Sequence, residues 1–122
     1  MERVLGIGGV LFRAKEPERL MRWYEQHLGV ACTGSAWLPE RGPTVLAALP
    51  ERTPYFGRME QGFLLNFRVA NLDRMAAQLR EAGVVVTCGE PHPVGRFARL
   101  HDPEGNPIEL WEATIDLGAP EP

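Results

Sequence analysis

Apolar and polar residues alternate along several stretches of the chain, and a period of two predicts β-strands. The first such stretch spans 4–14, where Gly8 and Gly9 interrupt the apolar pattern. Glycine inside a strand often marks a bulge or the close approach of another group. The other predicted strands span 30–33, 44–49, 63–69, 84–87, 96–101 and 108–111, with 36–38 as a further candidate.

Two other stretches carry apolar residues three and four positions apart, which predicts an amphipathic α-helix in each. The first helix has Pro17 in its opening turn, where proline is tolerated, and it ends at Gly29. Asn71 is predicted to cap the second helix, which spans 72–82 and ends before Gly83. Residues 50–62, which are polar and rich in turn-forming residues, are predicted to be a linker or a mobile loop.

The order of elements repeats, because Phe12-Arg13 and Phe67-Arg68 each precede a helix that ends in a Gly-Val pair. Each half therefore predicts a strand, a helix and about three further strands. Repeats of this kind decide the fold. The predicted fold class is α+β, with two βαβββ modules side by side forming one curved mixed sheet, helices on its outer face and a cleft on its inner face. The modules span about 4–60 and 63–113 of a single domain, 1–122, with a frayed tail at 114–122.

Composition restricts the class of partner. The net charge is −3, and the thirteen basic residues form no run, so nucleic acid is not expected. No apolar run approaches the ~20 residues needed to cross a membrane, and the N-terminus has no apolar core of signal-peptide length. Cys32 and Cys88 stand apart, without a C-x-x-C motif, which is typical of a reducing cytosol. We expect a soluble, cytoplasmic protein.

The strand and helix at the start, with Arg22-Trp23-Tyr24, and the ending Asp102-Pro103-Glu104-Gly105-Asn106 followed by Ile108-Glu109-Leu110 resemble the vicinal oxygen chelate superfamily. That superfamily includes glyoxalase I, bleomycin-resistance proteins and extradiol dioxygenases. The resemblance covers about residues 4–113. It implies the paired-module fold, and it implies a homodimer whose subunits complete or border the cleft.

Metal-using members of the superfamily carry four ligands on the cleft face. By resemblance, the first of these positions falls on Gly9, the second within 44–49, which holds no carboxylate, and the third on Leu64. Only the fourth is present, as Glu109. A divalent metal needs three or four nitrogen or oxygen donors, so no metal cofactor is expected. The alternative is Zn, Ni, Mn or Fe on Glu109 with a ligand set rebuilt from other residues of the second half, His92 and His101.

Alternation along the strands predicts which side chains face the cleft. Glu109 and Trp111 share the inward face of the last strand. Around a symmetric turn at 102–106, Arg99 would lie opposite Glu109 and Phe97 opposite Trp111. The candidate catalytic residue is Glu109, and the candidate cleft residues are Arg13, Asn66, Arg68, Phe97, Arg99, His101 and Trp111, with Trp37, Tyr55 and Phe56 as further candidates for the cleft walls.

Each candidate has a structural alternative. Glu109 and Arg99 could form a cross-strand ion pair that satisfies a partly buried carboxylate, or Glu109 could accept a donor from a ligand or act as a general base. Asn66 is either a satisfied polar residue or a ligand contact. Arg13 and Arg68 indicate an anionic ligand if they face inward, because the guanidinium fork suits carboxylate and phosphate, and otherwise they extend to solvent.

Three hypotheses for function follow. The preferred one is a metal-free protein, similar to glyoxalases and bleomycin-resistance proteins, that binds a small organic molecule in its cleft, with an anion favoured if the two arginines face inward. The second is a lyase, isomerase or dioxygenase that uses Glu109, either with a metal or as an acid or base. The third is a non-catalytic scaffold or accessory protein whose cleft is filled by its own aromatic side chains.

Overall fold

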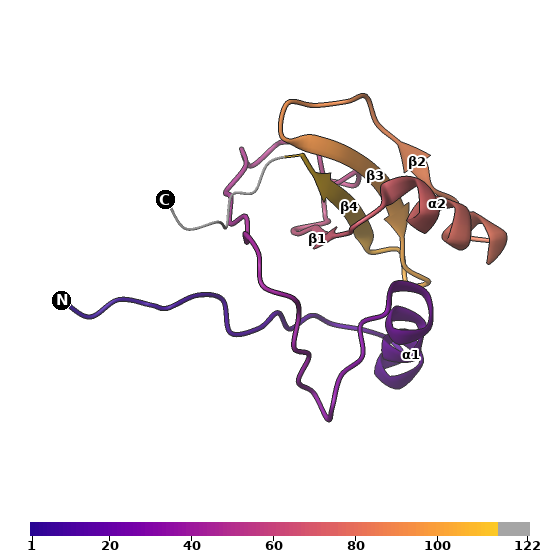
Figure 1. Cartoon of the computed structure of the whole chain (residues 1–122). Helices are drawn as coiled ribbons and strands as arrows, with labels where there is room; N and C mark the ends of the chain where they lie inside the picture. The colour runs from indigo at the N-terminus through magenta and orange to yellow at the C-terminus, as the bar shows by residue number, and fades with distance from the viewer. Residues whose placement is uncertain (115–122) are drawn as a thin grey trace.

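The computed structural model describes residues 1–114, which contain two helices and one mixed sheet (Figure 1). The elements in chain order are α1 (Pro17–Leu28), β1 (Leu65–Arg68), α2 (Leu72–Glu81), β2 (Thr87–Cys88), β3 (Gly95–His101) and β4 (Pro107–Ala113). The strand order in the sheet is β1-β4-β3-β2. β1 and β4 are parallel, and the other two pairs are antiparallel. The predicted α+β class is confirmed, whereas the predicted tail lies, apart from Thr114, outside the described residues.

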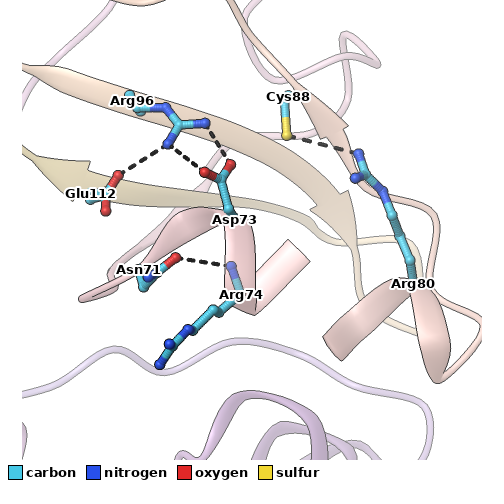
Figure 2. Close-up of polar contacts among 7 residues, drawn as sticks. All are labelled: Asn71, Asp73, Arg74, Arg80, Cys88, Arg96 and Glu112. Carbon is cyan, nitrogen blue, oxygen red and sulfur yellow. Dashed lines mark hydrogen bonds and ion pairs between the residues drawn. The ribbon is translucent and has the colours of Figure 1, made fainter. Parts of the chain in front are cut away.

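Both helices begin and end as their sequences predict. α1 has proline in its first turn, and Gly29 follows it in the left-handed conformation at φ 73°, which glycine adopts without steric cost. The Asn71 side chain accepts a hydrogen bond from the backbone N–H of Arg74 at 3.0 Å (Figure 2), which satisfies one of the free amides at the start of α2.

α2 packs on one face of the sheet, and α1 adds Leu20 and Tyr24 to the same core. β3 and β4 turn alternate side chains toward them, so that Ala98, Leu100, Ile108 and Leu110 are at most 2% exposed. These residues form one core with seven others from the helices and the segments next to them: Leu20, Tyr24, Val30, Leu72, Ala76, Leu79 and Val86. The opposite face of the sheet is therefore the inner face on which the candidate site lies.

An ion-pair cluster at the rim of this core fixes α2 to the sheet. The Arg96 guanidinium on β3 contacts Asp73 of α2 at 2.7 Å and Glu112 of β4 at 3.5 Å (Figure 2). The hydrogen bond from Arg96 lowers the pKa of Asp73. At the other end of α2, Arg80 donates to the carbonyl of Val86 at 2.7 Å. α2 is thus held at both ends over the strands.

The turn between β3 and β4 is organised around Asp102, which is only 4% exposed. Its carboxylate accepts hydrogen bonds from the backbone N–H groups of Glu104 and Asn106, from the Asn106 side-chain amide, and from the Tyr24 hydroxyl at 2.7 Å. Burial, followed by the bond to Asp102, raises the pKa of Tyr24 above its usual range. The turn therefore binds α1 as well as closing the hairpin.

Glu104, in the same turn, caps the start of α1. Its carboxylate accepts the backbone N–H groups of Lys15 and Glu16 at 2.6 and 3.0 Å. The Glu16 side chain makes no capping hydrogen bond, and a residue far along the chain instead binds the N-cap amide and the amide before it, which anchors the start of α1 to the turn.

The first half of the chain differs from the prediction. Residues 1–14 and 37–49 form no strand, and 30–36 contain only an isolated bridge between Thr33 and Ala36. The first residues extend away from the helices and the sheet (Figure 1), and Val4, Leu5 and Leu11 are at least 89% exposed. A strand exists only where a neighbour accepts its backbone hydrogen bonds, and within the described residues these segments have no such neighbour.

No helix in the described part of the chain is long and apolar enough to cross a membrane.

Candidate functional site

Glu109 lies in the middle of β4 on the inner face, with its side chain 10% exposed. The Asn66 amide of β1 donates to its Oε1 at 2.8 Å, and the Tyr55 hydroxyl donates to its Oε2. The Arg99 guanidinium of β3 lies 3.7 Å from Oε2. Each carboxylate oxygen therefore has a hydrogen-bond donor, and a cation stands beside one of them, as a buried carboxylate requires.

The register of the sheet produces this arrangement. Arg99 pairs with Glu109 across the antiparallel hairpin, and Asn66 pairs with Glu109 across the parallel pair. Because side chains of paired residues emerge on the same face, the two strands that flank β4 each place one polar group beside the Glu109 carboxylate. The predicted pairing of Arg99 with Glu109 is confirmed.

Tyr55 approaches from the loop 50–62 and covers the carboxylate. Its ring lies under the Arg99 guanidinium, 4.8 Å from the guanidinium carbon to the ring centroid, which is cation–π geometry. Arg99 also donates to the Tyr55 backbone carbonyl at 2.9 Å. Burial, followed by the hydrogen bond to Glu109, raises the pKa of the Tyr55 phenol, so the hydroxyl remains a donor at neutral pH.

Aromatic side chains fill the inner face next to Glu109. The Trp111 ring is stacked on Phe97 with a centroid distance of 6.0 Å and an interplanar angle of 1°, in the cross-strand pair that was predicted. Trp111 is 3% exposed, and its indole N–H donates to the Val94 carbonyl at 3.1 Å. The Trp111 indole lies against the backbone at residue 95, which must therefore be glycine: its φ is 149°, and a Cβ there would collide with the indole nitrogen.

The remaining predicted site residues lie away from this carboxylate. Arg68 is exposed, and its guanidinium donates to the Glu40 carbonyl at 2.9 Å. Arg13 is exposed on a segment outside the sheet, so it takes no part in the arrangement around Glu109. His101 lies at the exposed end of β3.

Two cavities lie near the turn between β3 and β4. One, of about 330 Å³, lies between the loop 50–62 and the turn after β3, with Phe56, Arg58 and His101 among its lining residues. The other, of about 440 Å³, lies near the start of β2, and Arg99 and His101 both line it. Small-molecule sites occupy roughly 300–1,000 Å³, so either cavity is large enough for a small ligand, and neither is lined by Glu109.

The residues around Glu109 do not fit a divalent metal. Its neighbours are an amide N–H, a phenol and a guanidinium, which offer donors or positive charge where a metal requires lone pairs. In residues 1–114, no three His, Cys, Asp or Glu side chains are grouped so that they could hold an ion. The positions that resemblance assigns to the other ligands remain a glycine, a leucine and a segment without carboxylates.

Tyr55 is the site residue that the sequence did not assign to Glu109. It was predicted only as a candidate for the cleft wall. The available signal was an aromatic pair inside a polar, turn-rich loop, where an apolar ring has no local partner. That signal indicates that the loop packs on something, but it does not say on what.

Comparison with known proteins agrees with the predicted resemblance. A family model described as a glyoxalase-like domain matches residues 9–111. An antibiotic-binding protein, TnmS3, from Streptomyces sp. CB03234 is 26% identical over 82% of this chain and 88% of that chain, with a TM-score of 0.55. The fosfomycin resistance protein FosX from Mesorhizobium loti is 16% identical over 93% of this chain and 96% of that chain, with a TM-score of 0.54.

A glyoxalase/bleomycin resistance protein from Streptomyces sp. CB03234 is 36% identical over a shorter stretch, which covers 43% of this chain and 46% of that chain at a TM-score of 0.39. No match was found among curated proteins. The family model spans both helices and nearly all of the sheet. The chain therefore belongs to the glyoxalase-like domain family.

Proposed function

We propose that the protein binds a small organic molecule on the inner face of its sheet, at Glu109, without a metal. The observation that carries the proposal is the set of groups around that carboxylate: an amide, a phenol and a guanidinium. These groups hold a carboxylate in position as a hydrogen-bond acceptor and leave no place for further metal ligands. Similarity to an antibiotic-binding protein over most of the chain supports binding as the activity.

An anionic ligand has less support than a neutral one. Arg68 already donates to the Glu40 carbonyl, and Arg13 is outside the sheet. The cation nearest to Glu109 is Arg99, whose charge is balanced by that carboxylate at 3.7 Å. An incoming anion would meet a neutral ion pair and not a free guanidinium.

A thermal-shift screen in EDTA tests the proposal. The panel holds antibiotics and other small organic molecules, sorted into acids, neutral compounds and amines, and it is run on the wild type and on Glu109→Gln. Glu90→Gln, which alters an exposed loop carboxylate, serves as the matched control. We expect at least one neutral compound to stabilise the wild type and the control, and to lose most of that effect in Glu109→Gln.

Metal content decides between this function and a metal-dependent lyase, isomerase or dioxygenase. The purified protein is incubated with Zn, Ni, Mn or Fe, dialysed and measured by elemental analysis. Stoichiometric metal in the wild type that is lost in Glu109→Gln would overturn the metal-free proposal in favour of the enzyme.

A second candidate, a non-catalytic scaffold, is favoured by the stacked pair Phe97 and Trp111. These rings fill the inner face beside Glu109 with the protein's own side chains. If the protein is a scaffold, no compound in the thermal-shift screen changes the unfolding temperature of the wild type or of either variant.

We also propose a homodimer. The arm formed by residues 1–11 exposes apolar side chains at alternating and adjacent positions, and β1 lies at an open edge of the sheet. Exposed apolar strands and open edges are both completed by pairing with another chain. A second copy of this chain carries the same two features, so the arm of one protomer could pair with the edge of its partner.

A further inference from the structure

We propose that the cleft takes a phenol-bearing ligand, and that Tyr55 occupies the position of the ligand's phenol until the loop 50–62 moves away. This inference rests on the proposed function, because it assumes that Glu109 is where a small molecule binds. It adds the chemical class of the ligand and the movement that admits it.

The loop is joined to the sheet through Tyr55. Its backbone hydrogen bonds are local turns, such as those from Thr53 to the Pro50 carbonyl and from Gly57 to the Pro54 carbonyl. Its ion pair, between Arg58 and Glu60, is also internal. The polar contacts recorded between this loop and the strands are the Tyr55 hydroxyl on Glu109, the Tyr55 carbonyl on Arg99, and the guanidinium over the ring.

The site selects a neutral donor at the position of the Tyr55 hydroxyl. Glu109 Oε2 accepts this hydrogen bond in a side chain that is 10% exposed. If Tyr55 leaves, its replacement must donate a hydrogen bond to that oxygen, because a buried carboxylate without hydrogen-bond donors is costly. A ligand carboxylate would instead place a second negative charge beside the first. A hydroxyl fits, and so would water, which is why the ring matters as well.

The site also selects an aromatic ring. Arg99 lies 4.8 Å from the ring centroid of Tyr55, and a guanidinium at this distance is attracted to the face of a π-system. Arg99 is held there by its hydrogen bond to the Tyr55 carbonyl at 2.9 Å and by Glu109 at 3.7 Å, and only the contact with Glu109 is independent of the loop. The guanidinium and the carboxylate are thus arranged for one shape, a six-membered ring with a hydroxyl at its edge.

Tyr55 can move away from Glu109 together with its loop. The residue is 44% exposed although it makes the polar contacts of its loop with the strands. The next three residues of the loop, Phe56 to Arg58, line a cavity of about 330 Å³. A ligand that binds only when the loop is open has its apparent affinity reduced by the fraction of open protein.

The experiment uses p-cresol, which reproduces the tyrosine side chain, and two matched probes. 4-Methylanisole keeps the ring and removes the O–H donor, and 4-methylbenzoate replaces the hydroxyl with an anion. Binding to the full chain is measured by NMR titration for the wild type, Tyr55→Ala and Tyr55→Phe. Met59→Ala, in the same loop with 61% of the residue exposed, is the matched control. Near-ultraviolet circular dichroism checks that each variant is folded.

We expect p-cresol to bind Tyr55→Ala at least about tenfold more tightly than the wild type or Met59→Ala, since the competing phenol is gone. Tyr55→Phe, which keeps the ring without the hydroxyl, should lie between them. 4-Methylanisole and 4-methylbenzoate should bind Tyr55→Ala weakly. Equal affinity of p-cresol for wild type and Tyr55→Ala, or equal binding of p-cresol and 4-methylanisole, would overturn the inference.

Trypsin reports the direction of the loop movement, because Arg52 and Arg58 lie in the loop. Saturating p-cresol should speed cleavage at these sites in the wild type if the ligand displaces Tyr55. Protection would mean that the loop closes over the ligand, and it would overturn the displacement. If other compounds in the EDTA screen bind at Glu109 while p-cresol binds no form of the protein, this inference fails and the proposed function stands. If nothing binds, both fail.

Discussion

Replacing Asp102 with alanine should be among the most destabilising single changes in this protein. The carboxylate is 4% exposed and accepts four hydrogen bonds that join the turn to itself and to α1. Alanine removes both acceptor oxygens, and with them all four hydrogen bonds, and keeps the backbone able to adopt the same turn. The loss is therefore one of hydrogen bonding and not of conformation.

The size of this destabilisation depends on whether each hydrogen-bond donor can find another acceptor once the Asp102 carboxylate is removed. The Tyr24 hydroxyl belongs to a residue that is 2% exposed, and a buried donor without a partner costs about 1–3 kcal/mol. The Asn106 amide and two backbone N–H groups are partly buried and can reach water, so each costs about 0.5–1 kcal/mol. We expect Asp102→Ala to lower the free energy of unfolding by about 2.5–6 kcal/mol, a large part of the ~5–15 kcal/mol typical of a domain.

A double-mutant cycle with Tyr24→Phe isolates the bond between Tyr24 and Asp102. In the wild type, Tyr24→Phe should cost about 1.5–3 kcal/mol, the range for a hydrogen bond to a charged group. In the Asp102→Ala background it should cost nothing or stabilise, since it removes the orphaned hydroxyl. The assay is urea unfolding followed by tryptophan fluorescence, with Glu90→Ala as an exposed control. A loss below 1 kcal/mol for Asp102→Ala, or equal costs of Tyr24→Phe in both backgrounds, would refute the reasoning.

Three further predictions concern the backbone, the tyrosines and the arm. Gly95→Ala should lower the free energy of unfolding by about 1–3 kcal/mol or more, because of its positive φ and its crowding, whereas Gly62→Ala, with open space around it, should change it little in the same urea assay. Both tyrosines have a raised pKa in the folded protein, so their contribution to stability is complete below the unfolded value near 10 and is lost as the pH rises beyond it. Urea midpoints should hold from pH 8 to 9.5 and then fall, less steeply in Tyr24→Phe; a flat profile to pH 11 would contradict the raised pKa values. Deleting residues 2–10 should convert a dimer into a monomer by light scattering, and a truncated protein that remains dimeric would place the interface elsewhere.

Most of the second half of the chain was predictable because its determinants are local, although the strand predicted over 84–87 is found only as Thr87–Cys88. Asn71 and the helical apolar spacing define α2, and the five-residue turn at 102–106 fixes the register of the last hairpin, from which the pairing of Arg99 with Glu109 follows. Alternation then indicates which side chains share a face. Helix caps, tight turns and the spacing of apolar residues can all be recognised from residues close together in the sequence.

The contact between the loop 50–62 and the sheet, which completes the site, was not predictable in the same way. The bond between Tyr55 and Glu109 joins residues 54 positions apart, and no period of two or 3.6 encodes a contact between a loop and a sheet. The strand predicted over 4–14 fails for a related reason. Alternation predicts which side chains of a strand share a face, but a strand also needs a partner for its backbone hydrogen bonds, and residues 4–14 pair with no strand of the described part of the chain.

The cap that Glu104 places on α1 has a consequence for the order of folding. The amides of Lys15 and Glu16 depend on a carboxylate 88 or 89 residues later, and Tyr24 depends on Asp102, 78 residues later. A helix of twelve residues is marginal alone in water. At roughly 5–20 residues per second during synthesis, this segment leaves the ribosome several seconds before its partners exist. α1 is therefore expected to form last, on a hairpin that has already closed, although it is the first helix in the chain.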